Sequence, residues 1–288
     1  MPELPEVETI VRGLGEKVKG RTFLDVWTDS PALFKKVSFK ELRKRIKGKR
    51  INGVRRRGKN IIFDLTGNYA LLVHQKITGH LLLGKWKKQG RVWVSKTKGV
   101  LLSDPMNQFL RAIFFLSGNL DMALSDLRKF AKIELWEKKE LEEYLKSFGP
   151  EPLSKEFTLN GLKKLFSGKK GKIKQILMDQ SFIAGIGNIY ASEILWEARI
   201  APTREAGKIK EKELKRIYLA IKKILKKAIK LQGDSFSDFR KVSGEKGRYQ
   251  DFARVYQKEG EKCPVCRGRI KRIKQGGRSS FFCPSCQK

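Results

Sequence analysis

The sequence has 288 residues, of which 40% are hydrophobic, and this length suffices for about two domains with their own cores. The 64 Lys and Arg residues outnumber the 30 Asp and Glu residues, so the formal net charge is +34. Such a charge favours a polyanionic partner, and nucleic acid fits better than a membrane surface because the basic residues are spread over the whole chain. Charge alone does not decide this, since lysine-rich sequences also occur in thermophilic proteins. No apolar run approaches the ~20 residues of a membrane span, and the acidic start is unlike a signal peptide, so we expect an intracellular protein that does not enter a membrane.

The first ten residues, MPELPEVETI, contain two prolines and three acids in a chain otherwise rich in lysine. Pro5 suits the first position of a helix, and Glu6 and Glu8 complement the positive end of the helix dipole. Apolar residues then recur at the spacing of one helical face: Val7, Ile10, Val11, Leu14 and Val18. The pattern predicts a buried helix from Pro5 onward, which would hold the start of the chain still. A helix alone leaves Pro2 and Glu3 unexplained.

Residues 20–135 are typical of an antiparallel β-sandwich or barrel, because short apolar runs alternate with turn signals. The clearest runs lie at 61–63, 70–73, 81–83 and 113–116. The stretch FGPEPLS at 148–154 interrupts regular structure and is the best candidate for a domain boundary.

Helical patterns follow this boundary. Residues 211–231 carry one apolar stripe with lysines on the remaining faces, which is typical of a surface helix in a helical domain. Residues 155–175 contain seven lysines and a single acid, Glu156. Residues 232–262 are polar and contain several glycines, which predicts a long loop, and loops of that length are usually functional or disordered.

All four cysteines lie near the C-terminus, in the spacing C-x2-C-x16-C-x2-C: Cys263, Cys266, Cys283 and Cys286. Two such pairs place four thiolates around one zinc ion in the closed arrangement of structural sites. The alternative, two disulfides, suits an intracellular protein poorly. We therefore expect one structural Zn²⁺ with no open position for a substrate.

The segment between the two cysteine pairs alternates basic and apolar residues around a Gln-Gly-Gly turn that is followed by Arg278. This pattern predicts a β-hairpin with a basic tip, which is suited to contact a DNA groove or backbone. A generic zinc ribbon is the weaker interpretation.

Four motifs occur together along the chain: MPELPEVETI at the start, GPEPL at 149–153, GNIYASE at 187–193 and the four-cysteine hairpin. As a set they resemble the formamidopyrimidine-DNA glycosylase family, bacterial enzymes that repair oxidised purines, and the resemblance covers essentially the whole chain. The stretch LPEV at 4–7 is more similar to this branch than to the related endonuclease VIII branch. The resemblance implies damaged double-stranded DNA as the partner and a monomer in the bacterial cytoplasm.

The resemblance also implies an α+β multidomain fold. The first expected part is an N-terminal catalytic domain, an antiparallel β-sandwich that carries the first helix. A linker, a helix–two-turns–helix DNA-binding domain and a zinc-finger β-hairpin follow it. The expected ranges of the four parts are 1–135, 136–150, 151–245 and 246–288.

Pro2 gains a role from the resemblance, because removal of Met1 would leave its secondary amine free. An α-amino group has a pKa near ~7.7–8.0, well below that of lysine at ~10.4, so a useful fraction is nucleophilic at neutral pH. Attack on C1′ of a damaged nucleotide would give a positively charged iminium that allows strand cleavage by successive eliminations. Glu3 would protonate the sugar ring oxygen and move protons later.

Other residues are assigned by position in the family's motifs. Lys59 resembles a strand lysine that contacts phosphate and assists β-elimination, and Arg278 resembles a zinc-finger arginine that grips phosphates and assists δ-elimination. Asn188 and Lys170 resemble backbone-phosphate ligands of the helical domain. Without the family context, Lys59 and Lys170 would be ordinary surface charges and Asn188 a turn residue.

Enzymes that extrude a nucleotide need residues to fill the gap in the duplex. The family uses a methionine after His-Leu-Gly, then an arginine and a phenylalanine. Here His74 is followed by Gln-Lys and by Ile77 in place of the methionine, whereas Arg128 and Phe130 are kept. Ile77 can be inserted into the gap, but its branched side chain is stiffer and less adaptable than that of methionine. The family's DNA-contacting histidine upstream of Arg128 is also missing, because the only histidines of the chain are His74 and His80. These departures concern the preferred lesion and the efficiency, not the type of reaction.

Three functions are compared on this basis. The first is a bifunctional DNA glycosylase and abasic-site lyase that removes oxidised purines such as 8-oxoguanine and formamidopyrimidines, or else prefers oxidised pyrimidines. The second is a damaged-DNA-binding protein that does not cleave, and only Pro2, Glu3 and Lys59 separate it from the first. The third is an RNA-associated zinc-ribbon protein, which would explain the charge and the cysteines but not the N-terminus.

Overall fold

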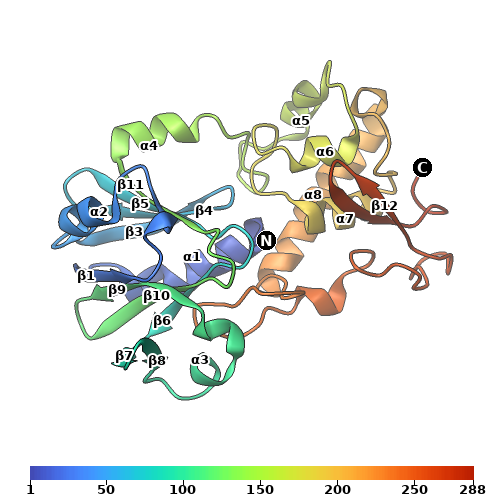
Figure 1. The fold of residues 1–288 in the computed structure, drawn as a ribbon. Coiled ribbons are helices and arrows are strands. Elements are labelled where there is room, and N and C mark those ends of the chain that lie inside the picture. Colours follow the sequence, from blue (N-terminus) through green and yellow to red (C-terminus); the bar gives the residue numbers. More distant parts are fainter. The chain divides into compact units, whose positions relative to one another are not determined.

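The computed structural model describes residues 1–288 and separates them into two units (Figure 1). The first unit contains residues 1–146 together with 231–248, and the second contains 147–230 together with 249–288. We call residues 231–248 the strap. This division differs from the expected domain ranges, because residues 231–245 of the expected DNA-binding domain and residues 246–248 of the expected zinc-finger range belong to the first unit.

The first unit is built on two sheets that share one apolar core (Figure 1). The four-stranded sheet has the order β1 (Phe23–Thr28), β9 (Leu110–Leu116), β10 (Leu120–Ser125) and β6 (His80–Gly84). The five-stranded sheet has the order β2 (Phe34–Lys35), β11 (Lys132–Glu137), β5 (Tyr69–His74), β4 (Asn60–Leu65) and β3 (Ile51–Arg57). Neighbouring strands are antiparallel except β2 and β11. The predicted apolar runs lie in β4, β5, β6 and β9, and the expected sandwich is confirmed.

Helix α1 (Leu4–Val18) contributes one buried face to this core. It begins one residue before Pro5, and its backbone departs from helical geometry at Gly15, where φ is 20°. Shorter elements complete the unit: η1 (Pro31–Leu33), α2 (Phe39–Ile46), β7 (Trp86–Gln89), β8 (Val92–Ser95), α3 (Val100–Ser103), η2 (Pro105–Gln108) and α4 (Lys138–Leu145). The expected linker thus contains α4, which contacts β5 and β11.

The second unit is helical and ends in a hairpin. Its elements are α5 (Leu159–Phe166), α6 (Ile173–Met178), α7 (Asn188–Glu197), η3 (Ala206–Lys208), α8 (Glu211–Lys230), η4 (Tyr249–Phe252), β12 (Lys271–Gln275) and β13 (Arg278–Phe282). The carboxylate of Glu193 on α7 is buried and accepts hydrogen bonds of 2.8–2.9 Å from the backbone N–H groups of 254–256. Strand β13 also contacts α7. The segment before the hairpin and the hairpin itself are therefore both attached to α7. The expected helical domain with a terminal hairpin is confirmed.

No helix of the protein combines the length and the apolar character needed to cross a bilayer.

Candidate functional site

The first residues of the chain are fixed by a reciprocal cap at the start of α1. The side chains of Glu3 and Glu6 are 1% and 0% exposed, and Pro2 is also buried. The backbone N–H of Glu3 donates to Glu6 Oε2 at 2.8 Å, and the Glu3 side chain accepts from the backbone N–H of Glu6. Both interactions satisfy groups that a helix start otherwise leaves unpaired. Pro2 is therefore held against a defined helix terminus and does not fray.

The strap approaches this helix start through Gly233 and Asp234. The backbone N–H of Asp234 donates to Glu6 Oε1 at 2.9 Å. Gly233 has φ +79°, and a Cβ atom there would lie 2.8 Å from Glu6 Oε1, so a larger side chain has no room. Glu6 thus links the first residues of the chain to the strap.

Lys59 lies in the turn between β3 and β4 and is 6% exposed. This hairpin is attached to α1, because Arg56 Nε donates to Glu8 Oε2 at 2.9 Å. Burial raises the pKa of Glu8, but the hydrogen bonds from Arg12 and Arg56 outweigh it and the pKa is lowered. Lys59 is therefore carried by a hairpin that an ionised carboxylate ties to the first two turns of α1.

His74 ends β5, directly before the loop that contains Ile77. Burial of the ring, followed by the charges of Lys76, Lys59 and Lys132, lowers its pKa to about 3. Nδ1 is the acceptor for the backbone N–H of Lys76 at 3.0 Å, which leaves the ring proton on Nε2. The ring is neutral at physiological pH and can donate one hydrogen bond.

The predicted gap-filling residues lie on two connected loops of the first unit. Thr78 Oγ1 donates to the carboxylate of Asp126 and accepts from the backbone N–H of Arg128 at 3.1 Å. Thr78 directly follows the half-buried Ile77, so these hydrogen bonds connect the two loops next to Ile77 and Arg128. The guanidinium of Arg128 lies 5.8 Å from the centre of the Phe130 ring, and Phe130 is 55% exposed. An exposed aromatic ring under an arginine is a suitable group to stack against a base.

The second unit brings Asn188 together with a lysine that the sequence analysis missed. Lys174 on α6 is 2% exposed, and its Nζ donates to Asn188 Oδ1 at 2.7 Å. It also donates to the carbonyl oxygen of Ser279 and to Ser280 Oγ, both at 2.9 Å. Lys174 therefore joins the start of α7 to strand β13 next to Arg278. The structure does not bring Lys170 into this network, since Lys170 lies on the exposed connection before α6.

A signal for Lys174 was present in the sequence. Ile173 and Leu177 are fully buried on the short helix α6, and Lys174 is the charged residue on the same buried side. A lysine that interrupts an apolar face needs acceptors for its three donors, which separates it from the solvated lysines around it.

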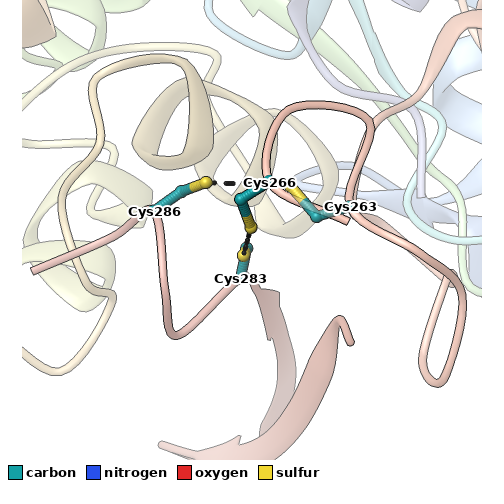
Figure 2. A group of neighbouring side chains, drawn as sticks. All are labelled: Cys263, Cys266, Cys283 and Cys286. Atoms are coloured by element: carbon teal, nitrogen blue, oxygen red, sulfur yellow. Dashed lines mark hydrogen bonds between the residues drawn. The ribbon is translucent and has the colours of Figure 1, made fainter. Parts of the chain in front are cut away.

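The four cysteines lie on two turns that face each other (Figure 2). Their sulfur atoms are all within 4.8 Å of one another, with Sγ–Sγ distances of 3.8 Å for Cys263–Cys286 and 3.4 Å for Cys266–Cys283. Zinc bound by thiolates at ~2.3 Å in a tetrahedron needs sulfur atoms about 3.8 Å apart, so the arrangement fits one zinc ion. Gln275 pairs with Arg278 across the hairpin turn, which leaves Arg278 exposed at the tip.

Comparison with known proteins identifies the family. The formamidopyrimidine-DNA glycosylase N-terminal domain matches residues 1–133, the H2TH domain of the same enzymes matches 148–240, and a zinc finger found in FPG and IleRS matches 260–288. The formamidopyrimidine-DNA glycosylases of Pelotomaculum thermopropionicum and Carboxydothermus hydrogenoformans are each 38% identical to the chain. These alignments cover 100% of the chain and 99% and 100% of the two relatives.

The chain belongs to the formamidopyrimidine-DNA glycosylase family.

Solved structures agree with this assignment. A variant of the Lactococcus lactis enzyme, in complex with a Fapy-dG containing DNA, is 32% identical, with a TM-score of 0.87 and complete coverage of both chains. The Lactococcus lactis enzyme with an abasic site containing DNA gives a TM-score of 0.86 at 32% identity, with 99% of each chain covered. As a member of this family the protein is a DNA N-glycosylase, and the expected family, zinc finger and single structural zinc are confirmed.

Proposed function

We propose that this glycosylase is bifunctional, removing oxidised purines and then cleaving the abasic strand through a Schiff base at the Pro2 amine. The observation that carries the proposal is the fixed position of Pro2 and Glu3. Both residues are buried, and Glu6 holds the backbone N–H of Glu3 at 2.8 Å. A nucleophile must be presented in one orientation to react efficiently, and a frayed N-terminus would not provide this.

The proposed reaction begins once Met1 has been removed. The secondary amine of Pro2 attacks C1′, the N-glycosidic bond breaks, and the base leaves with a proton. Glu3 protonates the ring oxygen, which opens the sugar and gives an iminium between Pro2 and C1′. Loss of the C2′ proton expels the 3′ phosphate, a second elimination expels the 5′ phosphate, and water then releases the sugar fragment from Pro2.

Two cations are assigned to the eliminations. Lys59 is proposed to contact a phosphate and assist β-elimination, and its burial beside α1 supports a fixed position. Arg278 is proposed to grip the flanking phosphates and assist δ-elimination from the hairpin tip. The zinc held by the four cysteines supplies folding free energy to this hairpin and takes no part in the chemistry.

The remaining proposed contacts hold the distorted duplex. Ile77, Arg128 and Phe130 would fill the space of the extruded nucleotide, and neutral His74 would donate from Nε2 to the DNA backbone. In the second unit, Asn188 and Lys170 are proposed to bind phosphates. We further propose that the protein acts as a monomer in the bacterial cytoplasm on damaged double-stranded DNA.

Oxidised purines are the proposed substrates, and oxidised pyrimidines are the second candidate. The Lactococcus lactis enzyme has been seen with Fapy-dG containing DNA, and also with an oxidised pyrimidine containing DNA. Paired excision assays on duplexes with 8-oxoguanine, formamidopyrimidine or 5-hydroxycytosine would rank them. Faster excision of the pyrimidine would replace the first assignment by the second.

Reductive trapping tests the chemistry itself. Borohydride should link the protein covalently to a duplex that contains an abasic site, and mass spectrometry should place the adduct on Pro2. A variant with one alanine added before Pro2 should bind the duplex but form no adduct. Full strand-nicking activity of that variant would refute the role of Pro2, and the absence of any wild-type adduct would favour a binding protein that does not cleave.

A further inference from the structure

His80 is a buried polar residue that the proposed reaction leaves without a role. It begins β6, two residues after Thr78, and its side chain is fully buried. Its Nδ1 lies 3.3 Å from the carbonyl oxygen of Thr78, and its Nε2 lies 3.2 Å from Oδ1 of Asn107 on η2. The ring therefore stands between the loop that carries Ile77 and the segment before β9.

Both ring nitrogens face oxygen atoms that can only accept a hydrogen bond. The amide of Asn107 has a fixed orientation, because Nδ2 donates to the carbonyl oxygens of Val100 at 2.9 Å and Gly244 at 3.1 Å. Burial lowers the pKa of His80 to about 4, so the ring is neutral at physiological pH and carries one N–H. The ring therefore bonds to one neighbour at a time, and its other nitrogen faces an acceptor with no proton between them.

On one side the ring reaches the two gap-filling loops, residues 75–79 and 126–131. The hydroxyl of Thr78 joins these loops, since it donates to Asp126 and accepts from the backbone N–H of Arg128. The carbonyl oxygen of the same residue faces the ring of His80. A shift of the Thr78 backbone therefore changes the contact with His80 and moves both loops together.

On the other side Asn107 reaches the strap at Gly244. Gly244 has φ +85°, and a Cβ atom there would lie 2.6 Å from Asn107 Nδ2, so a side chain has no room. The strap is also joined to β6 itself, because the backbone N–H of Leu83 donates to the carbonyl oxygen of Val242 at 2.8 Å. This end of the strap is thus held against the segment that carries His80.

Two further contacts keep the strap in one position. Arg240 donates to the carboxylate of Asp104 at 2.6 and 3.3 Å, and the two side chains are 5% and 15% exposed. Arg240 lowers the pKa of His80 and Asp104 raises it, so this ion pair acts on the ring in opposite directions. At the other end of the strap, the backbone N–H of Asp234 donates to Glu6 at the start of α1. The strap therefore connects Asn107 with the helix start that holds Pro2.

We propose that His80 is a positioning residue that couples the gap-filling loops to the strap, and through the strap to the start of α1. The assignment rests on the proposed function. When the loops enter the duplex, movement of Thr78 changes which neighbour the ring bonds to, and the strap responds through Asn107. Filling the gap is in this way linked to the position of the helix start that presents Pro2 and Glu3. The ring need not touch the DNA to act in this way.

The tautomer of His80 is the first measurement, because the chain has only two histidines, His74 and His80. Zinc-loaded protein labelled with ¹⁵N-histidine would be studied by long-range ¹H–¹⁵N correlation at pH 7, with and without an abasic-site duplex. Since the ring is fully buried, a change in its tautomer populations on binding reports on the loops and not on contact with DNA. We expect such a change in the wild type. In Asn107→Ala the proton should reside on Nδ1, because only the carbonyl oxygen of Thr78 remains as an acceptor.

A double-mutant cycle tests the coupling in function. Asn107→Ala removes the contact with the strap, and His80→Phe removes both ring nitrogens at a similar shape. Each should slow borohydride trapping on an abasic-site duplex in saturating enzyme by about three- to tenfold, the value of one hydrogen bond, with little change in affinity. The double variant should be no slower than either single variant, because both interrupt the same connection.

Gln108→Ala is the matched control. This neighbouring amide on η2 also donates to backbone carbonyl oxygens, those of Leu101 at 2.9 Å and Leu102 at 3.0 Å, but it is exposed. The variant makes the same kind of change next to Asn107 and should keep the wild-type rate of trapping.

The outcomes separate this inference from the proposed function. Losses that multiply in the double variant would show two independent structural roles and would overturn the coupling while the Pro2 chemistry stands. A His80 signal that is identical with and without the duplex would overturn it equally. The absence of any wild-type adduct would refute the proposed function, and the tautomer measurement would then decide alone whether the loops act on His80.

Discussion

Replacing Gln75 by leucine should stabilise the first unit. Gln75 is 1% exposed, and neither its side-chain oxygen nor its side-chain nitrogen has a hydrogen-bond partner. An unsatisfied buried polar group costs about 1–3 kcal/mol, and leucine has a similar volume without polar atoms. Because the substitution removes two such groups but makes the packing slightly different, we expect a gain of about 1–3 kcal/mol in the free energy of unfolding.

Urea denaturation of the zinc-loaded protein, followed by tryptophan fluorescence, measures this gain. In a thermal melt the same gain should appear as a rise of several degrees in the melting temperature, at about 2–4 °C per kcal/mol for a unit of this size. Gln75→Ala is the control, because it removes the same polar atoms but leaves a cavity that offsets the benefit. A Gln75→Leu variant that is less stable than the wild type would show that the amide is satisfied in solution and would refute the reasoning.

Other predictions concern the site and its supports. Glu3→Gln should reduce base excision strongly and nicking of a preformed abasic site much less, and equal losses in the two assays would argue against Glu3 as the acid of base excision. Cys283→Ser should remove the stoichiometric zinc and weaken DNA binding severely, since the metal stabilises its own hairpin. Any adduct formed by reductive trapping of this variant should still be on Pro2. Arg278→Ala should keep the zinc but lose most binding and cleavage, with the slope of log affinity against log salt smaller by about one; unchanged affinity would leave the hairpin a structural element only. Asp104→Asn should destabilise the strap by about 2–3 kcal/mol at pH 7, because it leaves buried Arg240 without its charge partner. Burial raises the pKa of Asp104, but the hydrogen bond from Arg240 outweighs it and the pKa is lowered, so the stability it provides is present above its ordinary pKa of ~3.9 and is lost as the pH falls through the lower value. Hydrogen exchange of residues 231–248 should therefore differ between wild type and variant at pH 7 and converge on acidification.

Local patterns predicted the elements that hold the site. The helix at the start of the chain follows from its apolar spacing and from Pro5, and both are properties of neighbouring residues. The zinc site follows from the spacing of the cysteines, because each pair occupies one turn and the closed four-thiolate arrangement has few geometries. Both features depend on residues that are close together in the sequence as well as in space.

Long-range contacts could not be predicted in the same way. The hydrogen bond from Asp234 to Glu6 joins residues that are 228 positions apart, and no periodicity in the strap signals it. The sequence of the strap predicts a long loop, because its polar residues and glycines follow neither helical nor strand periodicity. Its order comes from Gly233, whose missing side chain allows the close approach to Glu6, and from Arg240, which finds its partner in another segment.

Lys170 and Lys174 differ in burial, a property that the number of lysines in a stretch of sequence does not reveal. Both belong to one basic stretch, yet Lys170 is exposed whereas Lys174 is 2% exposed and donates to groups on α7 and β13. Burial of an ammonium group is costly unless every donor finds an acceptor, and Asn188, Ser279 and Ser280 meet that need here. Asn188 is therefore already engaged through Oδ1, so a phosphate bound beside it would also face the charge of Lys174. These contacts fix the position of the positive charge, and a Lys174→Met variant should lose it together with the link between α7 and the hairpin that carries Arg278.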